Sequence, residues 1–433
     1  MKNYINKLIP VVCLLFLVVG CTVEEFGNPN APDLDEIVLS EGDNLQETVV
    51  GMLNEGRGQI GPYLDNVSTL GREYYRLRSS DPRNTTELLG KGEEVLLGGS
   101  FYANAYYSAG YRAVKLSNII IDQMPNDPIF TTQETEATLG FVKTMKAYYM
   151  LLNLNLTYQN GIRVDVSDPF NLGPFLNYTD ALDALQIMLT EAYTHLGNGG
   201  TAFPFSPGSG FSNFDTPATF REVNKAIAAR VALYQDDMSS VLNNLNDSFL
   251  DLNGDFDLGV VYNFANAANE TRNPLYIPNT SGEVRAAHNS YAADIEAGDT
   301  RINKVENIAT ITDDGLSSDY NIAFIDSFES PLTLIRNEEL ILMYAEANIT
   351  TNPPATENAI NTIRTTHGLP VYSGGTDAAS LLDEVARQRR YSLFGEGHRW
   401  VDARRLGFLN TLPIDRPDDN VFDQMPLPDD EVN

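Results

Sequence analysis

Near its C-terminus the chain carries the charged segment Arg387-Gln388-Arg389-Arg390-Tyr391-Ser392-Leu393-Phe394-Gly395-Glu396-Gly397-His398-Arg399-Trp400-Val401-Asp402-Ala403-Arg404-Arg405-Leu406-Gly407. It contains the only tryptophan of the chain and glycines that allow a sharp turn between two helices. The planar guanidinium of arginine makes two-point contacts with carboxylates. We therefore predict a structural motif in which Arg399 and Arg405 pair with Glu396 and Asp402 around Trp400. The alternative interpretation is that these arginines hold an anion.

The segments that precede this motif are predicted to be helical. Apolar side chains recur at helical spacing, and small alanines allow close helix contacts, in residues 100–123, 134–158, 181–196, 223–234, 337–349, 355–367 and 378–394. Thr219-Phe220-Arg221-Glu222 matches a capping box at the start of one of them. The helices come in neighbouring pairs without a strict repeat period, which is typical of tetratricopeptide-like helical hairpins. We expect a mostly α fold, a helical-hairpin scaffold with long irregular insertions.

Composition limits the classes of function. The chain has 433 residues and a net charge of -30, which argues against a nucleic-acid partner. It has four histidines and two cysteines, so we expect no metal site and no cofactor.

The N-terminus has the pattern of a bacterial lipoprotein. Lys2 and Lys7 precede the apolar run 8–19, which is too short to span a bilayer, and Val18-Val19-Gly20-Cys21 resembles a lipobox. We predict a signal peptide over residues 1–20, a lipid on Cys21 and a tether over 21–35. A single domain is predicted over 36–433, with the scaffold mainly in 36–250 and 332–410 and a variable insertion in 251–331.

Two motifs were tested and given structural interpretations. Gly56-Arg57-Gly58-Gln59-Ile60-Gly61 matches a dinucleotide-binding fingerprint, but no strand precedes it, and we interpret it as a loop. The segment Asp251–Asp257 resembles the start of a calcium loop but lacks the glycine and glutamate that an EF-hand needs. We interpret it as a turn between a helix and a strand, and whether calcium binds there stays open.

The C-terminal segment resembles the signature of the SusD/RagB family, approximately E-R-R-x-E-L-x-x-E-G-x-R-W-x-D-L-x-R. Gln388 and Ser392 depart from it. Other segments resemble family motifs in the same order: Lys146-Ala147-Tyr148-Tyr149, Tyr158-Gln159-Asn160-Gly161, the helix from Arg336 to Ala347, Ala359–Arg364 with Gly368-Leu369, and the ending Met425-Pro426-Leu427-Pro428.

The resemblance implies a lipid-anchored protein of the outer membrane, facing the cell exterior. Such a protein binds nutrients, mostly oligosaccharides and sometimes peptides, and presents them to a SusC-like TonB-dependent transporter. Glu24 and Glu25 resemble the family's surface-export signal. No catalysis is implied. The alternatives are a surface hydrolase acting on glycans and a peptide-binding member of the same family.

Sugar binding needs flat aromatic faces and polar side chains. Because the only tryptophan lies in the structural motif, the platform must use tyrosine or phenylalanine. The segment 71–84 mixes both tyrosine and arginine, and residues 57–91 hold six basic and four acidic side chains. We predict a ligand site formed by Arg72, Tyr74, Tyr75, Arg83 and Asn84, with Tyr276 and His288 from the variable insertion. Alternatively, these arginines pair with neighbouring acids and support the scaffold.

Overall fold

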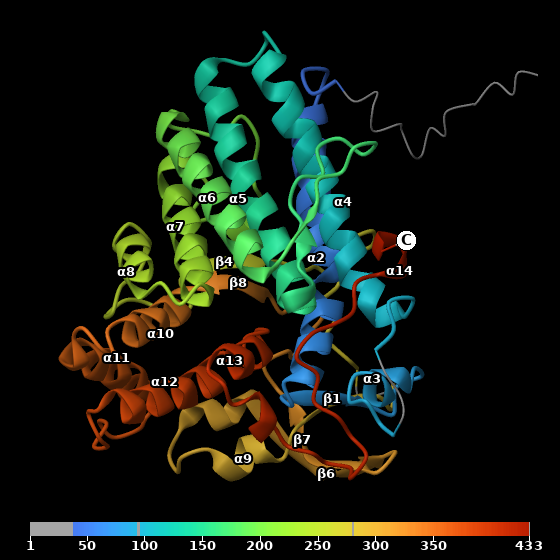
Figure 1. The fold of residues 1–433 in the computed structure, drawn as a ribbon, viewed down its shortest axis with the longest axis vertical. Helices are drawn as coiled ribbons and strands as arrows, with labels where there is room; N and C mark the ends of the chain where they lie inside the picture. Colours follow the sequence, from blue (N-terminus) through green and yellow to red (C-terminus); the bar gives the residue numbers. More distant parts are fainter. Residues whose placement is uncertain (1–37, 93–95, 279–280, 433) are drawn as a thin grey trace, which may run out of the picture.

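The computed structural model describes residues 38–92, 96–278 and 281–432 (Figure 1). The predicted signal peptide, Cys21 and the tether lie outside the described residues. Within them, no helix is long and apolar enough to cross a membrane.

Five long helices and one shorter helix form the first half of the scaffold. They are α2 (Asn44–Leu70), α4 (Phe101–Gln123), α5 (Thr132–Thr157), α6 (Tyr178–Asn198), α7 (Pro217–Tyr234) and α8 (Met238–Asn246). Each packs on the next along this series, and Figure 1 shows α4 to α7 side by side in the upper half of the molecule. The predicted helical-hairpin scaffold is therefore confirmed for this half.

The second half of the scaffold follows the variable insertion. Its helices are α10 (Asn337–Ala347), α11 (Pro353–Thr366), α12 (Ala378–Ser392) and α13 (Arg399–Arg405). Helices α10, α11 and α12 share an apolar core that includes Ile341, Ile360 and Val385. Helix α10 also packs against α7 and α8, so the two halves form a continuous stack.

Strands lie between and below the helices, and four of the eight in the described residues come from the segment 251–331. A four-stranded antiparallel sheet has the order β1 (Tyr74–Leu77), β5 (Val284–Ala287), β7 (Leu316–Ile322) and β6 (Val305–Asp313). Two-stranded pairs join β4 (Gly259–Tyr262) to β8 (Leu332–Arg336), and β2 (Ile162–Arg163) to β3 (Phe175–Leu176). The remaining short helices are α3 (Arg83–Thr86), α9 (Ser290–Asp294) and α14 (Asp429–Val432).

Two local predictions were wrong. Gly56 and Gly61 lie inside α2 and not in a loop. They let the helix approach its neighbours closely, since a Cβ would collide with Tyr149 at Gly56 and with Pro274 at Gly61. Helix α7 is capped by Thr216 and not by Thr219, whose backbone N–H donates to the Thr216 hydroxyl at 3.2 Å. Pro217 has no N–H to satisfy and therefore fits the first helical position.

Candidate functional site

The segment 387–407 joins α12 to α13 through contacts inside the scaffold. Trp400 is fully buried, and its Nε1 donates to the carbonyl of Phe422 at 2.8 Å. Asp402 accepts from Nε of Arg389 and from Nε of Arg405, both at 2.8 Å. The expected pairing of Glu396 with Arg399 is absent: Glu396 pairs with Arg336 at 2.9 Å, whereas the Arg399 guanidinium lies over the ring of Phe408. These arginines therefore link parts of the protein to one another.

Four of the predicted ligand residues are buried, namely Arg72, Tyr74, Tyr75 and Asn84. Arg72 donates to four carbonyls, including those of Pro413 at 3.2 Å and Asn420 at 2.6 Å. The Tyr75 hydroxyl donates to Asp415 at 2.5 Å. Segment 74–77 forms strand β1 at an edge of the four-stranded sheet, where Tyr74, Tyr75 and Leu77 are buried. This geometry favours the alternative interpretation, in which these residues support the scaffold.

The other predicted ligand residues lie at or near the surface. Arg83 is half exposed and makes two hydrogen bonds to the Asp81 carboxylate, at 2.8 and 2.9 Å. Tyr276 is half-buried beside Phe328, with ring centroids 4.7 Å apart. His288 contacts Asp415 at 2.9 Å, so the structure brings His288 and Tyr75 together around one carboxylate. Neither Arg83 nor Tyr276 is hydrogen-bonded to the Asp415 carboxylate.

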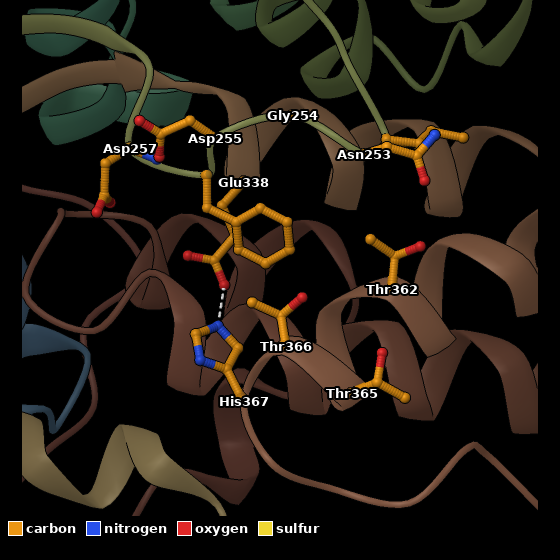
Figure 2. Close-up of a pocket in the computed structure, with 11 residues that line it drawn as sticks. Asn253, Gly254, Asp255, Asp257, Glu338, Thr362, Thr365, Thr366 and His367 are labelled. Carbon is orange, nitrogen blue, oxygen red and sulfur yellow. Dashed lines mark hydrogen bonds and ion pairs between the residues drawn. The ribbon is translucent and has the colours of Figure 1, made fainter.

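A cavity of about 650 Å³ lies elsewhere, between the segment 252–257 and the C-terminal end of α11 (Figure 2). Its lining combines one aromatic ring with amide, hydroxyl and carboxylate groups from Leu252, Asn253, Gly254, Asp255, Phe256, Asp257, Glu338, Thr362, Thr365, Thr366 and His367. Figure 2 shows the three threonines on one side and Asn253 and Asp255 across from them. The cavity is large enough for a sugar ring.

Short-range hydrogen bonds hold the segment 252–257 in place. The Oδ1 atoms of Asp251 and Asp255 each accept the amide two residues on, at 2.9 Å, which is the pattern of aspartate turns. The buried Asn337 at the start of α10 donates to the carbonyls of Asp251 and Asp255, at 2.8 and 3.1 Å. The predicted turn between a helix and a strand is thus found between α8 and β4.

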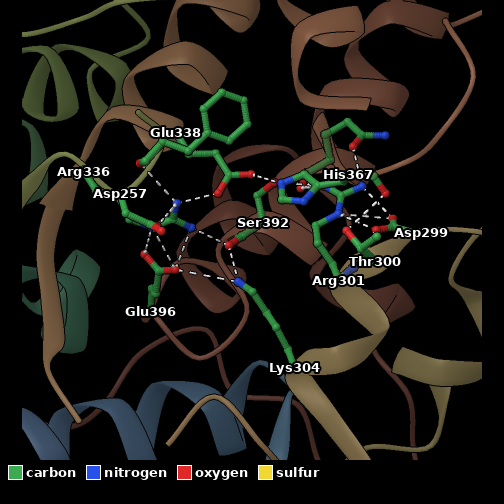
Figure 3. A network of polar contacts seen from close by, with 12 residues as sticks. Asp257, Asp299, Thr300, Arg301, Lys304, Arg336, Glu338, His367, Ser392 and Glu396 are labelled. Atoms are coloured by element: carbon green, nitrogen blue, oxygen red, sulfur yellow. Dashed lines mark hydrogen bonds and ion pairs between the residues drawn. The ribbon is translucent and has the colours of Figure 1, made fainter. Parts of the chain in front are cut away.

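Beneath the cavity lies an ionic network that links four elements of the chain (Figure 3). The Glu338 carboxylate contacts Nε2 of His367 at 2.6 Å and accepts from Nη1 of Arg336. Burial raises the pKa of Glu338, but the Arg336 charge and the His367 hydrogen bond outweigh it and hold that pKa well below its usual range. Glu338 is therefore ionised, and Nε2 of His367 carries the proton between them.

The cavity suits a ligand that carries many hydroxyl groups. The half-buried ring of Phe256 supplies an apolar surface, and Asp255, Asp257 and Asn253 are exposed. Carboxylates accept hydrogen bonds and threonine hydroxyls both donate and accept. Among the described residues no three His, Cys, Asp or Glu side chains are arranged to hold a metal ion. The calcium-like segment forms one wall of the cavity.

Sequence reasoning missed this cavity for a specific reason. The segment 251–257 was identified only as a turn, although the spacing of its aspartates around Phe256 also indicates a rigid loop with exposed acceptors. The helix at 355–367 was predicted, but its threonines are far from that loop in the sequence. Only the packing of α11 beside α10 brings Thr362 and Thr366 to the loop.

Taken together, the stacked helical hairpins with a polar cavity beside an irregular region define a helical-repeat protein with a candidate binding cavity. Residues 326–425 match the model of the SusD family. This match contains the segment 387–407, so the C-terminal part of the chain resembles the SusD family. A comparison with curated protein sequences finds no match.

Solved structures share the fold over most of the chain. Surface glycan-binding protein A from Bacteroides thetaiotaomicron, in complex with laminarihexaose, has a TM-score of 0.69 at 15% identity, covering 90% of this chain and 96% of that one. A SusD superfamily protein from Bacteroides vulgatus has a TM-score of 0.68 at 14% identity, with coverages of 90% and 96%. A SusD-like protein from Bacteroides fragilis has a TM-score of 0.67 at 16% identity, with coverages of 93% and 98%.

Proposed function

We propose that this protein is a surface lipoprotein that binds oligosaccharides without cleaving them, and that the cavity between residues 252–257 and α11 contacts the sugar. The observation that carries the proposal is this cavity, in which an aromatic ring and open hydrogen-bonding groups meet on a SusD fold. A similar fold belongs to a glycan-binding protein whose structure contains laminarihexaose. The ligand is then passed to a SusC-like TonB-dependent transporter, the partner that the family resemblance implies.

The test of the site uses Phe256→Leu, which keeps apolar packing but removes the flat ring. A panel of neutral oligosaccharides is titrated by calorimetry, with chromatography of each mixture to detect products. We expect reversible binding without products, and an affinity about fivefold lower for the variant, since an aromatic contact contributes on the order of 1 kcal/mol beyond its area. Product formation would favour the hydrolase alternative.

The matched control is Phe170→Leu, because Phe170 is 98% exposed and does not line the cavity. This variant should bind as the wild type does. Arg83→Ala and Tyr276→Ala test the site predicted from the sequence. Lost binding in those two variants, with normal binding in Phe256→Leu, would place the sugar at the surface that carries Arg83 and Tyr276.

The proposed anchor is a lipid on Cys21, with residues 1–20 removed as a signal peptide and 21–35 serving as a tether. Cys21→Ala should release the protein from the membrane fraction, because stable attachment requires more than one acyl chain and the variant can carry none on this residue. Cys13→Ala is the control and should stay attached, since Cys13 leaves with the signal. Full membrane retention of Cys21→Ala in cells without the transporter would contradict the anchor.

A further inference from the structure

We propose that the cavity selects uncharged glycans and rejects those that carry uronate or sulfate groups. This inference rests on the proposed function and names the ligand class for the same cavity. It follows from the charges that line the cavity and from how the nearby cations are already used.

The acidic side chains open to the cavity carry negative charge and accept hydrogen bonds. The Asp257 side chain is 88% exposed and forms a long ion pair with Arg336 at 3.5 Å. Asp255 is also exposed and uses Oδ1 to accept the amide of Asp257. Both carboxylates can therefore accept hydrogen bonds from sugar hydroxyls, whereas an anionic sugar would meet like charge.

No lysine or arginine lines the cavity within the described residues. The Arg336 guanidinium, which pairs with the lining residues Asp257 and Glu338, donates only to protein groups. Its Nε donates to Glu396 at 3.0 Å, its Nη2 to the carbonyl of Ser392 at 2.7 Å, and its Nη1 to Glu338. Figure 3 shows Lys304 directed at the same Ser392 and Glu396 pair. An anion in the cavity would therefore have to displace an existing ion pair, which leaves a buried carboxylate unpaired.

Three of the four arginines in the basic segment 72–83 are bonded within the protein. Arg72 is buried and donates to carbonyls, Arg76 pairs with Glu283 at 2.7 Å, and Arg83 pairs with Asp81. Arg78 is exposed, and its backbone N–H donates to the Asp313 carboxylate at 2.6 Å. The charge of -30 over the whole chain also disfavours an anionic ligand.

The experiment compares two probes of one carbon skeleton. The first is the tightest neutral oligosaccharide of the panel, and the second is the same compound after oxidation of its C6 alcohols to carboxylates. Binding of each is measured by calorimetry at low and at high salt. We expect the oxidised probe to bind at least about tenfold more weakly at low salt, with a smaller difference at high salt, where surface charges are screened.

The double variant Asp255→Asn, Asp257→Asn separates charge from shape. Asparagine keeps the Oδ1 acceptor that forms the turn at Asp255, so the loop keeps its structure. In this variant the affinities of the two probes should differ by about threefold or less, because the repelling charges are gone. Asp383→Asn, an exposed position on α12 outside the cavity, removes one charge as the control and should leave the difference unchanged.

Each other outcome counts against the inference. Equal or tighter binding of the oxidised probe overturns the inference while leaving glycan binding intact. The same holds if the double variant does not reduce the difference in affinity between the two probes. Binding of acidic glycans by a protein that binds no neutral one overturns it in the same way. Failure to bind any glycan overturns the proposed function itself.

Discussion

Glu73 is a buried carboxyl that makes the stability of the scaffold depend on pH. It follows the end of α2, where its carboxylate accepts from Ser68 Oγ at 3.2 Å and from the Gly395 amide at 3.3 Å. Burial raises the pKa of Glu73 from its ordinary value near 4.5 to about 7, and the Gly395 amide and the Arg399 charge only partly oppose this. The folded protein therefore holds a proton on Glu73 between these two pH values, where the unfolded chain has released it.

Glu73→Gln tests this consequence. In the wild type the free energy of unfolding should fall as pH rises from about 4.5 to 7, because the native state binds the extra proton, and the loss should approach about 3 kcal/mol above pH 7. Glutamine imitates the protonated acid, so the variant should be as stable as the wild type at pH 5 and more stable at pH 8. Denaturant titrations across this range measure both, with Asp383→Asn as the control. Parallel pH profiles for the wild type and Glu73→Gln would contradict the assignment.

At the scale of elements, a buried ion pair connects the two halves of the scaffold. Arg230 on α7 donates to Glu339 on α10 through Nε at 2.6 Å and Nη2 at 2.5 Å, and Nη2 also donates to the Leu334 carbonyl. Both side chains are buried. Removal of one partner therefore leaves an unpaired charge in the core.

Glu339→Leu should lower the free energy of unfolding by about 3–5 kcal/mol, because Arg230 loses its counter-charge. The double variant Arg230→Met, Glu339→Leu should recover most of that loss, since it leaves no buried charge. Equilibrium unfolding of the wild type, both single variants and the double variant measures the coupling between the two sites. A double variant that is as unstable as the sum of the single variants would show that the pair does not act as a unit.

The helices and strands also show how much of the fold could be predicted from the sequence. The helices at Asn337–Ala347 and Ala378–Ser392 were predicted to within two residues at each end, because their apolar spacing is regular. The sheet was missed, since β1 pairs with the distant β5 and Tyr74 lies opposite Ala287. One local signal existed: Asp314-Gly315, both with positive φ, joins β6 to β7 and is typical of a tight hairpin.

For the whole molecule, the helical scaffold and the resemblance of the C-terminal segment to the SusD family were accessible from the sequence, but the candidate site was not. In that segment Arg389 of α12 donates to Asp402 of α13, and Trp400 donates to the Phe422 carbonyl in the chain that follows α13. The cavity depends on how α11 lies beside the segment 252–257, which no local pattern encodes. Tyr74 and Tyr75 look like ligand residues in sequence, yet strand pairing buries both.

The most direct test of the account is a crystal structure of the protein soaked with the neutral oligosaccharide that binds most tightly. We predict a sugar ring against Phe256, with its hydroxyl groups hydrogen-bonded to Asp255 or Asp257 and to the threonines at the end of α11. The scaffold and the Arg336 network should be unchanged. Sugar density at Arg83 and Tyr276, with an empty cavity between residues 252–257 and α11, would contradict the central claim.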